Sequence, residues 1–216
     1  KASICINGVS LTISSIYKNF FDNEKEKSSI LLKNADIIFT LDFNSLSRAR
    51  NLSNLISKSS AKIIMIDHHE NPDKYADIMI SDSKMSSTCE MVYDFICLID
   101  KNKINNKIAT CLYTGIVADT GSFRYPSTTS KTLKTGAELI NYGVNVTEIY
   151  EKLYNNFQFK RLKLLGAAIN NYKKIDGLPV LYTMITDHDQ KINDFKKGDS
   201  EGFVNFGLSV TGILCS

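Results

Sequence analysis

The chain has 216 residues and a mass of 24.2 kDa; 43% of its residues are hydrophobic and 23% are charged. This composition is typical of a folded globular protein and excludes an intrinsically disordered chain. The 26 Lys and Arg residues exceed the 23 Asp and Glu residues by only three. A net charge of +3 is too small to indicate a nucleic-acid-binding surface on its own.

The cysteines number five and form no Cys-x-x-Cys pair. Such spacing is typical of small core residues in a reducing compartment, so we expect a cytoplasmic protein. No run of the sequence reaches the roughly 18 apolar residues of a membrane span, and we expect no membrane partner. The chain starts without Met and stops just after an apolar run, so we expect a piece of a longer protein.

Short apolar runs rich in β-branched residues alternate with segments of helical spacing. The runs span residues 35–43, 61–67 and 76–82. This alternation predicts an α/β fold, with buried parallel strands and helices on both faces of the sheet. Residues 45–58, between the first two runs, are expected to form a helix. Residues 1–34 give a weaker pattern, in which the charged stretch 22–29 is typical of a loop or an exposed helix.

Helix starts are visible further along the chain. Ser87-Thr88-Cys89-Glu90 fits a capping box, in which the first and last side chains bond each other's backbone. A helix over residues 107–118 is predicted to end at Asp119, and a helix capped by Thr129 or Ser130 is predicted to run to Ile140.

The character of the sequence changes in its last third. One long helical stretch is predicted over residues 147–174, followed by a strand over 178–185 and a loop leading into a helix over 194–210. We therefore predict two domains, over residues 1–157 and 158–216, the second being smaller and incomplete.

Acids and imidazoles follow the predicted strands and one helix. Asp42 ends one apolar run, Asp67-His68-His69 ends the next, and Asp119 follows the helix over residues 107–118. Ligands bind outside the carboxyl ends of parallel strands, and a mixed carboxylate and imidazole site suits Mn²⁺ and related divalent ions. Each residue alone also fits a turn, a helix cap or a polar loop. Their joint appearance and order favour a function.

Four ordered motifs carry a family resemblance. They are LDFNSLSR (41–48), IDHHENPD (66–73), SSTCEMVY (86–93) and GIVADTGSFRY (115–125). With the trailing segment DSEGFVNFGLSVTGI (199–213), the chain resembles the DHH/DHHA1 phosphoesterase superfamily over residues 30–213. Within it, the chain is most similar to the branch of bifunctional oligoribonucleases and 3′-phosphoadenosine-5′-phosphate (PAP) phosphatases. The resemblance implies a DHH domain followed by a DHHA1-like substrate-binding domain.

The resemblance also implies a metal centre. Asp42 would bridge two Mn²⁺ ions, with Mg²⁺ as an alternative metal, and His68 and Asp119 would be ligands of one of these ions. A pair of ions about 3.5–4 Å apart can clamp a phosphate and activate water for in-line attack.

Further residues would act on the substrate. His69 would face the substrate phosphate, where it would stabilise charge or donate a proton, and Asp67 would orient an imidazole by a hydrogen bond. Arg48 and Arg124 would contact phosphate, because the guanidinium group matches phosphate geometry.

The chain departs from the family pattern in two places. The family's first motif, a His followed by two closely spaced Asp residues, has no counterpart here, since the three histidines are His68, His69 and His188. The glycine-rich motif expected late in the accessory domain is also missing. We therefore expect half a metal centre in residues 1–216 and no activity from this stretch alone. Asp187-His188-Asp189 superficially resembles a metal cluster, but its position favours a solvated helix start.

The resemblance implies hydrolysis of short oligoribonucleotides, of PAP or of both, with either substrate as the binding partner. Three alternatives stay open at this point: an inorganic pyrophosphatase, a cyclic-dinucleotide phosphodiesterase, and an inactive remnant that binds nucleotides. The DSEGFVNFGLS segment favours hydrolysis of oligoribonucleotides or PAP over a pyrophosphatase, because pyrophosphatases of the superfamily carry a different C-terminal domain. A homodimer is an open alternative to a monomer.

Overall fold

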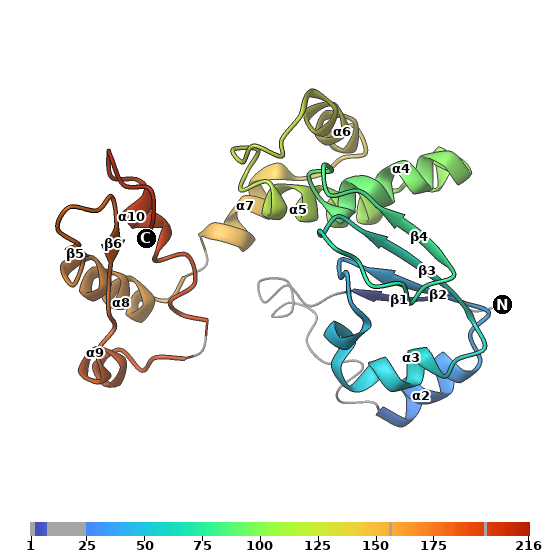
Figure 1. The fold of residues 1–216 in the computed structure, drawn as a ribbon. Helices are drawn as coiled ribbons and strands as arrows, with labels where there is room; N and C mark the ends of the chain where they lie inside the picture. The colour runs from blue at the N-terminus through green and yellow to red at the C-terminus, as the bar shows by residue number, and fades with distance from the viewer. Residues whose placement is uncertain (1–2, 8–24, 156, 197) are drawn as a thin grey trace. The chain divides into compact units, whose positions relative to one another are not determined.

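The computed structural model describes residues 3–7, 25–155, 157–196 and 198–216 (Figure 1), and for 3–7 and 25–28 it describes the backbone only. The chain divides into two compact units, Lys1–Ile149 and Tyr150–Ser216. The division falls inside helix α7 (Val146–Tyr154). The boundary expected after residue 157 lies further along the chain, just beyond the end of this helix.

The first unit contains a parallel four-stranded sheet. Its strands are β1 (Ser3–Asn7), β2 (Ile37–Leu41), β3 (Lys62–Asp67) and β4 (Ile78–Ser81), and their spatial order follows the chain. All three strand pairs are parallel. The three strands expected from the apolar runs are thus confirmed, and β1 is an addition that the sequence pattern did not indicate.

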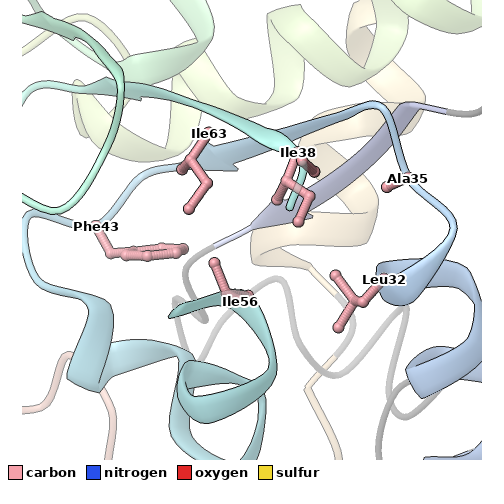
Figure 2. Close-up of a cluster of buried hydrophobic side chains, with 7 residues drawn as sticks. Leu32, Ala35, Ile38, Phe43, Ile56 and Ile63 are labelled. Carbon is pink, nitrogen blue, oxygen red and sulfur yellow. The ribbon is translucent and has the colours of Figure 1, made fainter. Parts of the chain in front are cut away.

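Alternate residues of β2 face opposite sides of the sheet. Ile38 packs in a buried apolar cluster with side chains of α2 (Lys25–Lys33) and α3 (Ser53–Ser57). Figure 2 shows the side chains of this cluster pointing toward one another. The buried members are Leu32, Ala35, Ile38, Phe43, Ile56, Ala61 and Ile63. On the other side of the sheet, the Phe39 ring meets Phe95 edge-on, with ring centroids 5.7 Å apart.

Phe95 belongs to α4 (Thr88–Asp100). The elements that follow α4 in the chain are η2 (Lys101–Lys103), α5 (Asn106–Asp119) and α6 (Ser130–Ile140). Figure 1 shows α2 and α3 on one face of the sheet and α4 and α5 on the other. The prediction of a parallel sheet with helices on both faces is therefore correct.

The helix starts are confirmed, with one correction at α4. The Ser87 hydroxyl accepts from the Glu90 backbone N–H at 3.1 Å, as an N-cap should. The Glu90 side chain, however, does not return to Ser87; it bonds the hydroxyls of Ser86 and Thr132 instead. At α6 both halves of a capping box are present, between Thr129 and Thr132.

Two predicted helices are each interrupted. Residues 45–58 contain a 3₁₀ segment, η1 (Leu46–Leu52), followed by α3, and Arg50 leaves helical geometry inside η1, at φ 50°. The long helix expected over residues 147–174 is two helices, α7 and α8 (Phe159–Asn170). Asparagine is a weak helix former, and Asn155 lies at the interruption.

The second unit combines helices with a small sheet. Its strands β5 (Lys173–Lys174) and β6 (Leu181–Tyr182) pair antiparallel, and Val180 bridges Cys215 in parallel. The strand expected over residues 178–185 is thus much shorter than predicted. The helices that follow β6 are α9 (Asp187–Ile192) and α10 (Asn205–Leu208).

The Asp187-His188-Asp189 sequence forms the start of α9, as expected. Thr186 caps this helix, and the Asp189 carboxylate accepts from the Thr186 backbone N–H in a complete capping box. Across the described residues, no helix combines the length and the apolar character needed to span a membrane.

Candidate metal centre

Three backbone segments deliver the polar side chains of the site. Asp42 follows the last residue of β2, Asp67 is the last residue of β3 and is followed by the two histidines, and Asp119 is the last residue of α5. The Asp42 N–H donates to the Ile66 carbonyl at 3.1 Å, so the loop after β2 stays paired with β3. Because parallel strands end at one edge of a sheet, β2 and β3 bring their terminal side chains together.

The geometry gathers Asp42, His68 and His69. One ligand atom from each lies within 4.8 Å of the other two, and all three residues are partly buried. The His68 Nε2 atom lies 3.7 Å from Asp42 Oδ1 and 3.9 Å from Asp119 Oδ2. The rings of His68 and His69 meet edge-on, with centroids 5.1 Å apart.

Hydrogen bonds fix how each imidazole faces the site. His68 Nδ1 lies 3.2 Å from the Met85 carbonyl, and His69 Nδ1 lies 2.7 Å from Asp67 Oδ1. Both partners are acceptors, so both contacts require a proton on Nδ1, and in a neutral imidazole the lone pair is then on Nε2. The fully buried Asp67 also accepts from the His69 backbone N–H at 3.0 Å. Carboxylates and carbonyls commonly orient metal-binding histidines in this way.

The two carboxylates that face His68 hold their protons more tightly than usual. Burial, followed by the nearby charge of Asp42, raises the pKa of Asp119 from 3.8 to about 6. Burial also raises the pKa of Asp42, and the hydrogen bond from Thr88 Oγ1 to Asp42 Oδ1, at 3.0 Å, partly offsets this. These two half-buried carboxylates and the nearby imidazoles form a set of metal-ligating groups. A divalent cation bound there would neutralise the negative charge of the ionised carboxylates.

Unusual backbone geometry flanks two of the acidic residues. Asp42 has φ 66°, and the turn after Asp119 carries Gly121, Ser122 and Phe123 at φ 54°, 65° and 62°. Left-handed conformations in non-glycine residues cost on the order of 1–3 kcal/mol each and concentrate at functional sites. Thr120 supports the turn: its hydroxyl donates to the Ile116 carbonyl at 2.6 Å and accepts from the Phe123 N–H at 2.9 Å.

The two predicted phosphate-binding arginines are both exposed. Arg48 lies on η1, which follows the Asp42 loop. Arg124 lies on the turn after Asp119, where its Nε donates to the Gly121 carbonyl at 2.7 Å. The structure therefore brings together Asp42, Asp67, His68, His69 and Asp119, while the two arginines lie on segments that adjoin this cluster.

Thr88 and the Met85 carbonyl contact the site without having been predicted to do so. Thr88 lies within one of the four motifs, but its hydroxyl partner is 46 residues away in the chain. The carbonyl of Met85 is a backbone group, for which no residue type is diagnostic.

Comparison with known proteins agrees with this geometry. The sequence matches the family described as the DHH family, N-terminal domain, over residues 6–116, which is more than half of its 216 residues. The chain belongs to the DHH family. The matched range includes Asp42, Asp67 and both histidines of the cluster, whereas Asp119 lies just beyond its end.

Two curated relatives of this DHH chain carry similar names. The "Bifunctional oligoribonuclease and PAP phosphatase NrnA" of Bacillus subtilis (strain 168) is 41% identical over 115 residues, which are 52% of this chain and 36% of the relative. The "Probable bifunctional oligoribonuclease and PAP phosphatase NrnA" of Streptococcus mutans serotype c is 38% identical over 109 residues, 50% and 34% of the two chains. These alignments span about a third of each relative.

A solved structure matches almost the whole DHH chain. The crystal structure of an exopolyphosphatase-related protein from Bacteroides fragilis superposes with a TM-score of 0.89 at 34% sequence identity. The match covers 97% of this chain and 63% of the other. The family assignment made from the four motifs and the α/β fold expected from the sequence are therefore both confirmed.

Proposed function

We propose that this DHH chain forms part of a metal-dependent phosphoesterase that hydrolyses short oligoribonucleotides, PAP or both. The observation that carries the proposal is the cluster of Asp42, His68 and His69, with Asp119 3.9 Å from His68. The names of the two relatives support the substrate class.

The side chains would divide into metal ligands and substrate groups. Asp42, His68 and Asp119 would hold Mn²⁺, or Mg²⁺ in its place. A divalent cation bound there polarises a phosphoryl oxygen and lowers the pKa of water. The Nε2 atom of His69 would face the substrate phosphate. With a proton on both ring nitrogens, the imidazolium would stabilise charge or donate its Nε2 proton to the leaving oxygen. Asp67 would orient that ring through its bond to Nδ1, and Arg48 and Arg124 would contact phosphate groups.

The test is hydrolysis by the protein expressed from its complete coding sequence, supplied with Mn²⁺. Phosphate release from PAP and nucleotide release from a short oligoribonucleotide are expected. His68→Ala and Asp119→Ala should each lose nearly all turnover while keeping the fold. Full activity in either variant would contradict the assignment of the site.

The same assay separates the alternatives. Phosphate release from pyrophosphate, without turnover of PAP or RNA, would indicate a pyrophosphatase, and cleavage of a cyclic dinucleotide alone would indicate a phosphodiesterase for such substrates. Tight nucleotide binding without any metal-dependent turnover would indicate an inactive remnant.

A further inference from the structure

The segment Met85–Thr88, between β4 and α4, touches two residues of the metal cluster. The Met85 carbonyl holds His68 Nδ1, and the Thr88 hydroxyl donates to Asp42 Oδ1 at 3.0 Å. One short segment thus determines both the tautomer of an imidazole and the position of a carboxylate. Whatever fixes this segment also fixes the cluster.

Glu90 fixes the segment from inside the protein. Its side chain is 1% exposed, and its Oε2 accepts from Ser86 Oγ at 2.5 Å and from Thr132 Oγ1 at 3.0 Å. The Glu90 backbone N–H donates to the Ser87 hydroxyl. The residues between Met85 and Thr88 are therefore both bonded to Glu90, one through its side chain and one through its backbone.

The same carboxylate reaches a third element. Thr132 lies in the first turn of α6, where it also completes the capping box with Thr129. Glu90 consequently joins the loop before α4, α4 itself and the N-terminus of α6. A shift of this carboxylate would move the Met85–Thr88 segment relative to the sheet that carries Asp42 and His68.

Stability alone does not explain a carboxylate at this position. Glu90 Oε1 is buried without a hydrogen-bond partner among the described residues. Burying a polar atom in this way costs free energy, and replacing buried hydrogen-bonded groups with apolar groups of the same shape is often nearly neutral for stability. Departures of this kind from good packing are expected where function requires them.

We propose that Glu90 is a positioning residue for the metal centre, acting through Ser86 on the Met85 carbonyl and the Thr88 hydroxyl. The proposal deepens the proposed function and rests on it for the role of the metal. It predicts that loss of the Glu90 carboxylate loosens His68 and Asp42 without removing any ligand.

The first measurement uses metal-free protein. Long-range ¹H–¹⁵N spectra distinguish the two neutral imidazole tautomers, and the chain has only three histidines to assign. In the wild type we expect His68 in the Nδ1–H form, and in Glu90→Leu a mixture of both forms. His69 is an internal reference, because its Nδ1 is bonded to Asp67 rather than to the Met85–Thr88 segment.

The second measurement is titration of the same proteins with Mn²⁺ alone. We expect Glu90→Leu to bind Mn²⁺ about 10- to 100-fold more weakly, the usual effect of losing an outer partner of a metal ligand. Glu90→Gln keeps an acceptor oxygen and should retain most of the wild-type affinity. Ser86→Ala breaks the same link with a smaller change and should also weaken binding, so the test does not depend on the folding of Glu90→Leu.

Glu138→Leu is the matched control. Glu138 is a carboxylate on α6 that bonds Tyr93 of α4 and Lys101, and among the described residues no hydrogen bond links its side chain to the Met85–Thr88 segment. The Glu138→Leu substitution should leave both the His68 tautomer and the Mn²⁺ affinity unchanged.

The outcomes separate the two proposals. Unchanged tautomer and unchanged affinity in folded Glu90→Leu and Ser86→Ala would overturn the role of Glu90. A change of tautomer in a protein whose wild type binds no Mn²⁺ would support the positioning of His68 and contradict the metal-dependent function. Equal weakening by Glu138→Leu would also overturn the proposal, because the effect would then be general.

Discussion

Asp67 lies outside the cluster of Asp42, His68 and His69, yet it holds one of the two imidazoles in place. Its buried carboxylate accepts from both the ring Nδ1 and the backbone N–H of His69. In Asp67→Asn one of the two acceptor oxygens becomes an NH₂ group, which can only donate, so one of these two bonds is lost and the imidazole is held less firmly. We expect turnover of PAP to fall about 10- to 100-fold, and Mn²⁺ affinity, measured by titration, to change much less.

The control for this change is Asp82→Asn. Asp82 follows β4 and is exposed, and within the part of the chain that the structure describes its side chain accepts one hydrogen bond, from the Lys84 backbone N–H at 2.9 Å. It should keep wild-type turnover. Wild-type turnover in Asp67→Asn would show that the bond to His69 has no part in the reaction.

The two arginines lead to a different kinetic prediction. Arg48 and Arg124 are exposed, and Arg124 also donates to the Gly121 carbonyl. As phosphate contacts they would act on the substrate, so their loss should weaken substrate binding. A charge-assisted hydrogen bond contributes about 1.5–3 kcal/mol, so we expect KM for PAP to rise roughly tenfold or more in Arg48→Ala or Arg124→Ala. Lys58→Ala, which removes another exposed cation after α3, should leave KM unchanged. Unchanged KM in both arginine variants would exclude them as phosphate contacts.

At the scale of elements, the pairing of α4 with α5 depends on a glycine. A Cβ at Gly115 would lie 2.1 Å from Cys89 Sγ, so the two helices approach closely only because Gly115 has no side chain. We expect Gly115→Ala to lower the free energy of unfolding by about 1–3 kcal/mol, as overpacking does. Denaturant unfolding measures this change.

Gly166→Ala is the matched control, since a Cβ there has no atom within 4 Å and Gly166 also lies inside a helix, α8. It should be neutral or stabilising by about 0.4–1 kcal/mol. Cys89→Ala should recover part of the loss in Gly115→Ala. An equal effect of both glycine changes would show that helix propensity, and not the contact with Cys89, decides the result.

The elements that were predictable from sequence are those specified by local pattern. The runs that became β2, β3 and β4 are short and β-branched, and Ser87 and Thr129 bond to backbone only three residues away. Asp42, Asp67 and the histidines were accessible because they directly follow such strands. The interruption of the helix near Asn155 was missed because helical periodicity continues on both sides of it.

Contacts between distant segments were not predictable in this way. Glu90 has the spacing of a capping box, yet Thr132, 42 residues further along, competes successfully for its carboxylate. The bond from Thr88 to Asp42 likewise depends on how α4 packs beside the sheet. Single-sequence patterns describe what a residue can bond locally, whereas tertiary packing decides which of the available partners it takes.

At the scale of the whole molecule, the two compact units lead us to expect separate unfolding transitions. Only the transition of Lys1–Ile149 should respond to metal, because this unit contains the metal cluster.

The pKa of Asp119, about 6 in the folded state, exceeds its ordinary value of 3.8. In metal-free protein the stabilisation from this tighter proton binding is complete below pH 3.8 and is lost as the pH rises through 6. A bound cation has the opposite preference, because it requires the ionised carboxylate.

We therefore expect Mn²⁺ to raise the unfolding temperature of this transition more at pH 7.5 than at pH 5, because at pH 5 the cation must displace a proton from Asp119. Scanning calorimetry with Mn²⁺ and with a chelator at each pH measures the difference. In Asp119→Asn, which cannot ionise, the gain from Mn²⁺ should be smaller and should vary less with pH. An equal gain at both pH values in the wild type would show that proton release from this carboxyl is not coupled to metal binding.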